Sequence, residues 1–371
     1  MKPIMVSSDS GDNGVVVSGD NYLRKLRNRY LKFLEDMSFK NTKEDASYEQ
    51  VDEIYDAVCS LRQVQSLPAE VIRACCAYAD VVSRYDTFEN KVKNAHFTAV
   101  AVEIDNLLSS ATMRSMPDDG ARMKEDCELF HIKLVNPELY KKLHPTRGPL
   151  HPVFEEMIAI LQTDLNPFFP THPRHHKTLI AAVLQYIEAC QLENDYTDSS
   201  FEVQVDMPRF PLFLREKSGL SEGFILFIVT APHLVPGNYA SEDVSSDRTF
   251  FYNKVYPMFP EMFAASGHIN DIMSFYKECE EEEDVSGTNY ISSVAKIKNI
   301  TALEALDDLM KQAVEIRKNS MAIAERSGSM EVQRTVAQYF QGLISWHISW
   351  ERRYRLGEMP LVYGNMQLAN L

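Results

Sequence analysis

The sequence predicts an all-α fold. Glycine is scarce, at 14 of 371 residues, and in most long segments the apolar side chains recur every three or four positions and do not alternate. Recurrence of this kind gives a helix one buried face. Two segments follow it closely, and their apolar positions are Leu23, Leu26, Tyr30, Phe33 and Leu34 in the first and Leu179, Val183, Tyr186, Ile187 and Cys190 in the second.

Short breaks separate the helical segments, and none is long enough to be a flexible linker between domains. They fall at 117–120, 145–152, 166–173 and 208–211. Large helical proteins of this length are often one unit, so we expect a single α-helical domain over residues 21–358. Residues 1–20 are rich in Ser, Asp and Gly and are predicted to be a disordered N-terminal tail. Residues 359–371 are predicted to be a C-terminal tail.

The composition limits the compartment and the partners. A formal net charge of −15 argues against nucleic acid or an anionic membrane as a partner, because both attract basic surfaces. No continuous apolar run marks an N-terminal secretory signal, and the most apolar stretch, 224–229, is too short to span a bilayer. The six cysteines have no regular spacing, which favours a reducing, cytoplasmic location over a disulfide framework.

A nine-residue string carries the most specific chemistry. Residues 270–278 read Asn-Asp-Ile-Met-Ser-Phe-Tyr-Lys-Glu. On a helix, Asn270, Ser274 and Glu278 are successive i+4 neighbours and share one face. Their amide, hydroxyl and carboxylate oxygens form a hard-ligand set that suits Mg²⁺, which takes its remaining ligands from water and phosphate. Lys277 returns to nearly the same face and can meet a phosphate as a point charge.

Polar residues at this spacing usually mark the solvated side of an amphipathic helix. The spacing alone therefore leaves open whether these residues form a metal site or a solvated helix face. The identity of the whole string is more informative. It resembles the Asn/Asp-Asp-x-x-Ser/Thr-x-x-x-Glu metal motif of class I terpene synthases, and in particular the version found in the fungal trichodiene synthase family. Three more segments resemble that family in the same order. Residues 97–106 (FTAVAVEIDN) resemble the helix that ends in the aspartate-rich motif, and residues 210–219 (FPLFLREKSG) resemble the segment with the diphosphate-sensing arginine. Residues 350–356 (WERRYRL) resemble the C-terminal Arg-Tyr motif.

This resemblance, from about residue 22 to 358, implies the helical bundle of class I terpenoid synthases around a deep active-site cavity. It implies that Asp105 bridges Mg²⁺ ions on one wall, three ions in all with bound diphosphate. On the opposite wall, Asn270, Ser274 and Glu278 are the implied chelating residues. The residues implied to bind diphosphate are Arg215, Lys277, Arg353 and Tyr354, and those implied to be catalytic are Asp105, Arg353 and Tyr354. Arg352 and Arg355 are interpreted as surface charge.

The implied reaction is Mg²⁺-dependent ionisation of a prenyl diphosphate, with farnesyl favoured over geranyl diphosphate, and cyclisation to a sesquiterpene hydrocarbon or alcohol. An allylic cation needs an apolar, aromatic cavity that excludes water and stabilises positive charge. Trp346 and Trp350, four residues apart and close to Arg353, are candidates for that wall, with core packing as the alternative. The resemblance also implies a homodimer. The product depends on the contour of the cavity and is not predicted.

The aspartate-rich motif departs from the family pattern. Where the family begins the motif with two aspartates, this chain has Asp105 followed by Asn106. We expect activity, because the first aspartate is the one that the family uses most directly for metal. The alternative is a non-catalytic or weakly active isoprenoid-diphosphate-binding protein with a decayed motif. The nearby acidic residues at 118–119 and 195–198 are interpreted as solvated turns.

Other enzyme and metal-site classes fit less well. A prenyl chain elongation enzyme needs two DDxxD motifs, and the Asp-Asp pairs at 118–119 and 307–308 do not continue as one. A carboxylate di-iron bundle needs ExxH on two helices, whereas only 128–131 fits. The histidines of 171–176 lie at proline breaks without cysteine or carboxylate partners, so we predict that they are exposed in a loop.

Overall fold

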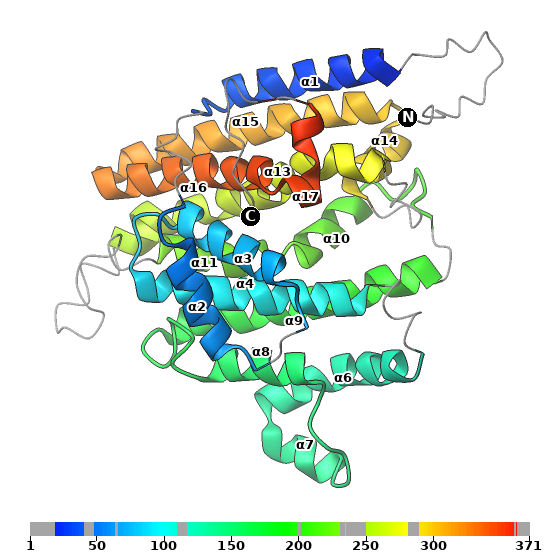
Figure 1. Ribbon diagram of the computed structural model, residues 1–371, viewed down its shortest axis with the longest axis vertical. Coiled ribbons are helices and arrows are strands. Elements are labelled where there is room, and N and C mark those ends of the chain that lie inside the picture. The colour runs from blue at the N-terminus through cyan, green and yellow to red at the C-terminus, as the bar shows by residue number, and fades with distance from the viewer. Residues whose placement is uncertain are drawn as a thin grey trace.

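The computed structural model (Figure 1) describes residues 19–40, 48–63, 66–109, 117–198, 202–230, 234, 250–280, 289–359 and 361. Within these ranges every regular element is helical and no strand is present, which confirms the all-α class. The two predicted tails lie almost entirely outside the described residues. The α-helices are α1 Gly19–Asp36, α2 Val51–Leu61, α3 Ala69–Val82, α4 Phe88–Leu108, α6 Pro117–Val135, α7 Pro137–Leu143, α8 Pro152–Gln162, α9 Pro173–Asp198, α10 Phe210–Ser218, α11 Ser221–Val229, α13 Phe259–Glu280, α14 Tyr290–Lys298, α15 Ala302–Ser327, α16 Met330–Ser349 and α17 Glu351–Tyr354. Short turns of other helix types are η1 Phe251–Val255, η2 Tyr256–Met258 and η4 Leu356–Glu358.

Six helices form a closed ring in which each packs on the next. The order around the ring is α3, α4, α9, α10, α13, α16 and back to α3. Helix α11 contacts α4, α9, α13 and α16 and closes the ring on one side. Outside the ring, α1 and α15 form an outer layer at one end of the molecule, while α6, α7 and α8 lie at the other (Figure 1). The ring brings segments from both halves of the sequence around one interior.

The helix ends are set by local hydrogen bonds. The hydroxyl of Thr87 accepts a bond of 3.3 Å from the N–H of Asn90 and starts α4. Thr301 and Glu304 form a reciprocal capping box at the start of α15. That helix ends at Gly328, whose φ of 77° lies in the left-handed region that favours glycine. Such caps satisfy backbone groups that the helices themselves leave unpaired.

Charged side chains are buried around helix α4, which packs against α2, α3 and α8. Arg62 forms ion pairs with Glu103 and, at 3.0 Å, with Glu156. His96 on α4 contacts the same Glu156 at 2.7 Å through Nε2. All four side chains are buried, and breaking such a pair leaves an uncompensated charge in the interior. Through Glu103, this cluster anchors α4 two residues before Asp105.

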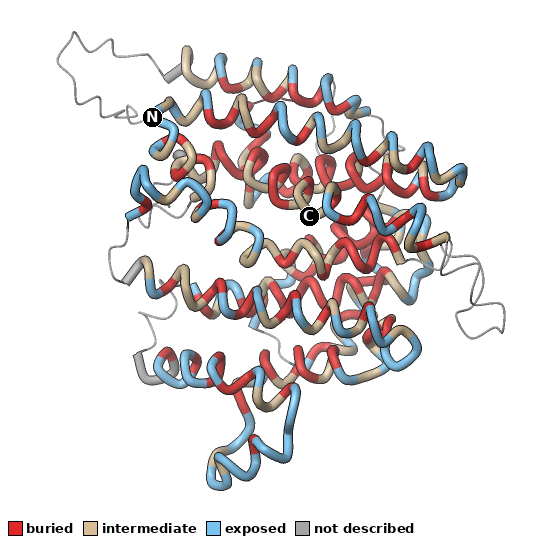
Figure 2. Tube along the Cα trace, turned by 180° about the vertical axis from the view of Figure 1, so that it is seen from behind, coloured by how far each residue is buried: buried red, intermediate tan, exposed pale blue. Residues whose placement is uncertain are grey.

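The predicted buried faces agree with the structure. The apolar positions of the first stripe belong to α1 and those of the second to α9, and all but the half-buried Leu23 are buried. Figure 2 shows the buried residues concentrated on the inner helices, with the exposed residues facing outward. Five cysteines are free thiols, namely Cys59, Cys75, Cys76, Cys127 and Cys190. Among the described residues, no helix has the length and apolar character that a membrane crossing requires.

Three local predictions were wrong. Residues 117–120 were expected to break the chain, but Pro117 starts α6, because proline is tolerated at the first position of a helix. The acidic residues at 118–119 and 195–198 were interpreted as turns, but the first pair belongs to α6 and the second segment to α9. The histidines of 171–176 were predicted to be exposed in a loop, but His175 lies in the first turns of α9 and is buried. Its ring centre is 5.8 Å from that of Phe168 and 5.1 Å from that of Phe251.

Gly342 on α16 marks a close approach between two ring helices. A Cβ atom placed there would lie 2.5 Å from the carbonyl oxygen of Val81 on α3. We expect Gly342→Ala to lower the free energy of unfolding by about 1–3 kcal/mol, because backbone atoms must move apart. Gly148→Ala is the matched control, since its Cβ would meet no atom within 4 Å. Urea unfolding followed by circular dichroism measures both variants, and equal stability of the two would contradict this contact.

Candidate active site

The ring of helices encloses a cavity of about 460 Å³, which is within the range of small-molecule sites. Its lining comes from α3, α4, α9, α10, α11, α13, α14, α16 and α17. Eight of the ten residues predicted from the sequence line it, and these are Asp105, Arg215, Asn270, Glu278, Trp346, Trp350, Arg353 and Tyr354. Ser274 and Lys277 are not among the lining residues.

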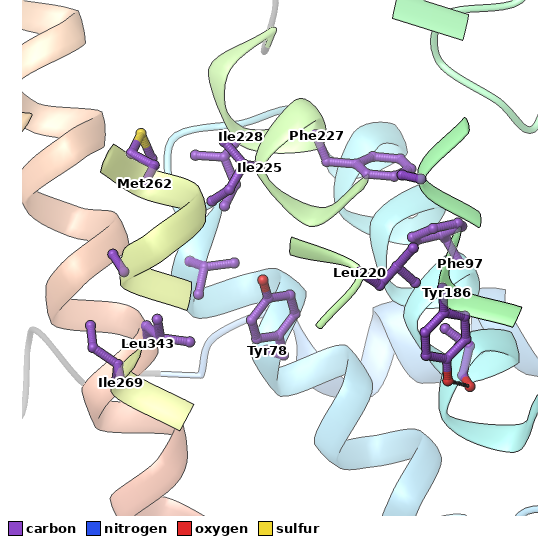
Figure 3. Packing of buried hydrophobic residues seen from close by; sticks show 14 of the residues in the cluster. Tyr78, Phe97, Tyr186, Leu220, Ile225, Phe227, Ile228, Met262, Ile269 and Leu343 are labelled. Atoms are coloured by element: carbon purple, nitrogen blue, oxygen red, sulfur yellow. Dashed lines mark hydrogen bonds between the residues drawn. The ribbon is translucent and has the colours of Figure 1, made fainter. Parts of the chain in front are cut away.

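One wall of the cavity is built by α4 and α9. Asp105 lies in the last turn of α4 and is exposed into the cavity, while Asn106 does not line it. Glu193 on α9 lines the same space, and burial together with the charge of Asp105 raises its pKa to about 7. The two helices are tied together by the Tyr186 hydroxyl, which donates to the carbonyl of Ala101 at 2.8 Å (Figure 3). Two helices thus present carboxyl groups to one volume.

The facing wall is the C-terminal half of α13. Asn270, Asp271 and Glu278 line the cavity there. Ser274 is buried, and its hydroxyl contacts the backbone carbonyl of Asp271 at 3.5 Å. Burial raises the pKa of the Glu278 carboxyl, and a hydrogen bond from Ser274 opposes that shift. Ser274 therefore lies beside Glu278 and behind the cavity surface.

Two neighbouring polar groups also act on Glu278. The side-chain N–H of Asn289, at the start of α14, donates to its Oε2. The charge of Lys277 lowers the pKa of the Glu278 carboxyl, though less than burial raises it. Lys277 is half-buried next to the site without reaching the lining. Its expected contact with a phosphate stays a prediction.

Two arginines approach the cavity from different helices. Arg215 on α10 donates from Nε to the carboxylate of Asp271 at 2.9 Å and from an η nitrogen to the carbonyl of Gly267 at 3.2 Å. The guanidinium of Arg353 on α17 lies 5.3 Å from the centre of the Trp350 ring and 5.9 Å from that of Tyr354. One arginine is held by a carboxylate, and the other is held over aromatic faces.

Aromatic rings form the apolar part of the cavity. Trp346 packs edge-on against Tyr78, with ring centres 5.4 Å apart, and lies 5.3 Å from Trp350. Tyr78 in turn packs edge-on against Phe224 at 5.6 Å. The indole N–H of Trp346 donates to the carbonyl of Ala74 at 2.8 Å, so the ring has its polar edge satisfied. Figure 3 shows Tyr78 beside buried aliphatic residues from other helices.

The site concentrates negative charge. The carboxyl groups of Asp105, Glu193, Asp271 and Glu278 all have raised pKa values, in each case chiefly because of burial. Arg215 opposes all four of these shifts. Four carboxyl groups therefore face two arginines, and a further cation would lower the free energy of the ionised site.

The donor set fits a hard cation only if other oxygens complete it. No three His, Cys, Asp or Glu side chains of the described residues lie together in a way that could hold a metal ion. The carboxylates are divided between two walls, so an ion here would also need the amide oxygen of Asn270 and oxygens from water or phosphate. Mg²⁺ commonly binds in this way, with few protein carboxylates and several exchangeable oxygens.

Among the lining residues that sequence reasoning missed, three carry polar side chains with contacts to the predicted site. Glu193 lies in a helix whose end was interpreted as a turn, and nothing in its sequence context distinguished it. Asp271 is the second residue of the nine-residue string and was given no role, although it binds Arg215. His347 follows Trp346, and its Nε2 lies 3.2 Å from the side chain of Asn270. The pairing of α16 with α13 was needed to find this contact.

The chain was compared with known protein families and sequences. The sequence model of the family described as Trichodiene synthase (TRI5) matches residues 137–369. The chain is 28% identical over 202 residues to trichodiene synthase of Fusarium sporotrichioides, with 53% of this chain and 48% of that protein covered. It is 26% identical over 200 residues to that of Fusarium pseudograminearum, with the same coverage. The chain thus spans about half the length of the curated relatives it matches.

Solved structures were compared as well. An α-eudesmol synthase aligns with a TM-score of 0.49 at 14% identity, covering 88% of this chain and 95% of that one. A linalool/nerolidol synthase from Streptomyces clavuligerus aligns with a TM-score of 0.47 at 12% identity and the same coverage.

Glu193 allows a test of the electrostatics of the site. Its pKa is about 7 in the folded protein and 4.5 ordinarily, so folding takes up a proton between these values and stability falls as pH rises through that window. We expect Glu193→Gln, measured in EDTA, to raise the free energy of unfolding by roughly 1–3 kcal/mol at pH 8. The gain should shrink toward pH 5, where the wild-type carboxyl is protonated in the folded state.

The matched control is Asp195→Asn on the same helix, whose side chain is 68% exposed. It should change stability little at either pH, because an exposed carboxylate keeps its hydration. An equal gain for Glu193→Gln at pH 5 and pH 8, measured by thermal unfolding, would contradict the titration assigned to Glu193.

Proposed function

The chain belongs to the trichodiene synthase family, and on that premise we propose that it is a Mg²⁺-dependent sesquiterpene cyclase. Its proposed substrate is farnesyl diphosphate, and its products are a cyclic sesquiterpene and diphosphate. One observation carries the proposal: Asp105 faces Asn270 and Glu278 across a single cavity, whose other lining includes two arginines and several aromatic rings. The cavity therefore has a polar part that suits a diphosphate next to an apolar part that suits a prenyl cation, and cyclisation requires both.

The polar part of the cavity suits the diphosphate group. Arg215 and Arg353 are candidates to bind its oxygens, because guanidinium groups bind phosphate through paired N–H donors and stay charged when desolvated. The hydroxyl of Tyr354 and the ammonium group of Lys277 are further proposed donors. As the carbon–oxygen bond breaks, the leaving group gains negative charge, and donors already fixed in place stabilise it without reorganisation.

The two carboxylate-bearing walls are the proposed metal site. Asp105 is the proposed ligand on α4, and Glu193, which shares its electrostatic environment, is a further candidate from α9. Asn270, Ser274 and Glu278 are the proposed ligands on α13. Bound Mg²⁺ would neutralise the diphosphate and act as a Lewis acid on its oxygens.

The apolar part of the cavity suits the carbocation. Trp346 and Trp350 are proposed to form its wall near Arg353, with Tyr78 and Phe224 continuing the aromatic surface. Aromatic faces stabilise positive charge, and closely packed apolar side chains keep water from the cation. The contacts of Trp346 with Ala74 and Tyr78 hold its ring in one orientation.

The second candidate function is a diphosphate-binding protein without turnover. The observation that favours it is the asparagine that follows Asp105, which leaves α4 with one carboxylate at the site. A cyclase accounts better for the rest of the lining, because a binder has no need for aromatic walls next to the diphosphate donors.

A product assay separates these two functions. We expect the protein, incubated with farnesyl diphosphate and Mg²⁺, to release diphosphate and a sesquiterpene that gas chromatography with mass spectrometry detects in the headspace. Geranyl and geranylgeranyl diphosphate should give slower turnover. Replacing Mg²⁺ with EDTA is the control and should abolish product. Tight binding of farnesyl diphosphate without product would instead support the binding protein.

Asp105 and Asn106 are adjacent, and only Asp105 lines the cavity. We expect Asp105→Ala to lower kcat/KM for farnesyl diphosphate by about 100-fold or more, because a group that acts on the charged transition state is lost. Asn106→Asp adds a carboxylate outside the lining and should retain turnover. Steady-state diphosphate release measures both variants, and unchanged turnover in Asp105→Ala would exclude Asp105 from the metal site.

A further inference from the structure

The segment that carries two of the proposed diphosphate donors is tied to α13 outside the cavity. Helix α17, with Arg353 and Tyr354, packs against α13 and α16 (Figure 1) and is followed by η4. The hydroxyl of Tyr276 on α13 donates to Oε2 of Glu358 in η4 at 2.6 Å. Tyr276 is buried, and neither Tyr276 nor Glu358 lines the cavity. A bond of this length from a hydroxyl to a carboxylate is charge-assisted and therefore strong.

Arg355 takes part in the same contact. Its Nε and one η nitrogen donate to the two carboxylate oxygens of Glu358 at 2.7 and 3.1 Å, and its guanidinium lies 5.8 Å from the centre of the Tyr276 ring. The sequence interpretation treated Arg352 and Arg355 alike, as surface charge. Arg352 agrees with it, because its side chain is 75% exposed. Arg355 is half-buried and binds the carboxylate that Tyr276 also binds, so it belongs to a link between η4 and α13.

The backbone around Arg355 makes this segment one closed turn. Arg355 ends α17 with a φ of 56°, in the left-handed region that favours glycine. A residue with a Cβ atom is strained there, and the hydrogen bonds from the side chain to Glu358 offset that strain. The N–H of Arg355 donates to the carbonyl of Glu351 at 2.8 Å, and the N–H of Gly357 donates to the Glu351 carboxylate at 2.5 Å. Glu358 and Arg353 therefore belong to a single compact unit.

We propose that Glu358, held by Tyr276 and Arg355, is a positioning residue that sets the place of Arg353 and Tyr354 in the cavity. The inference rests on the proposed function, because it gives these two residues a purpose only if they bind diphosphate. Tyr276 belongs to the helix that presents the proposed metal ligands. Its bond to Glu358 therefore fixes the diphosphate donors relative to those ligands, and a diphosphate that is to meet both needs them at the right separation.

Isothermal titration calorimetry of inorganic pyrophosphate at a fixed Mg²⁺ concentration measures this arrangement without turnover. We expect Tyr276→Phe and Glu358→Ala each to lower the affinity by about fivefold or more, as is typical of coupling between separate sites. The double variant should bind no more weakly than either single variant, because both remove the same contact. Glu358→Gln keeps an acceptor oxygen for Tyr276 and should recover part of the loss.

Two backgrounds show which groups the contact acts through. Where Arg353→Gln and Tyr354→Phe have removed both donors, Tyr276→Phe should have little further effect. In an Arg215→Lys background it should keep its full effect, because Arg215 reaches the cavity from α10. A purely structural weakening of α13 would instead lower the affinity in both backgrounds.

Arg355→Gly separates the backbone turn from the side chain. Glycine adopts the observed φ without strain, so this variant should melt close to the wild-type temperature. It should nevertheless lose pyrophosphate affinity as Glu358→Ala does. The matched control is Arg352→Gln in the same segment, which removes an exposed ion pair with Glu70 and should leave the affinity unchanged.

The outcomes separate this inference from the proposed function. If the wild-type protein does not bind pyrophosphate with Mg²⁺, both fail. If the wild type binds and Tyr276→Phe and Glu358→Ala bind equally well, only the positioning role fails. That role also fails if Tyr276→Phe causes the same loss after Arg353 and Tyr354 have been replaced. Full affinity in Arg355→Gly would remove the Arg355 side chain from the proposal. Thermal melts without Mg²⁺ verify that each variant is folded.

Discussion

The central constraint on this molecule is the gathering of four carboxyl groups around one cavity. Asp105 and Glu193 stand on one wall, and Asp271 and Glu278 on the other. Removal from water disfavours the ionised form of a carboxyl group, and the raised pKa values express that cost. Repulsion from neighbouring carboxylates adds to the shift at Glu193 and Glu278. The packing of the surrounding helices holds the four groups together despite this cost, and a bound cation would lower it.

Rigid packing behind each wall holds the carboxyl groups in place. Behind α4, Arg62 pairs with Glu103 and Glu156 in the interior, so the helix that carries Asp105 is fixed by charge as well as by apolar contacts. On the other side, α16 approaches α3 closely at Gly342 and places Trp346 against the cavity. The buried interactions that stabilise the fold therefore also set the distance between the two walls.

Much of the site was predictable from the sequence because its chemistry is local. The string 270–278 lies on a single helix, so its spacing defined a shared face, and WERRYRL placed Arg353 and Tyr354 next to two tryptophans. Glu193 and His347 could not be found in this way. Their importance depends on contacts across the ring of helices, α9 with α4 and α16 with α13, and helical periodicity predicts which face is buried but not which partner it meets.

Pro117 and His175 were misjudged for a related reason, since proline and histidine are typical of loops but also occur in the first turns of helices.

The departure at Asn106 is best understood from the whole cavity. One helix contributes a single carboxylate where a pair was expected, yet α9 brings Glu193 into electrostatic contact with Asp105. The total negative charge of that wall is thus determined by two helices and not by one motif. On the facing wall, the proposed ligand Asn270 is neutral, so its orientation is set by hydrogen bonds and not by charge. A carboxylate presents an oxygen whichever way it turns, whereas an amide does so in only one of its two orientations, so the hydrogen bonds of Asn270 decide which of its atoms faces the cavity.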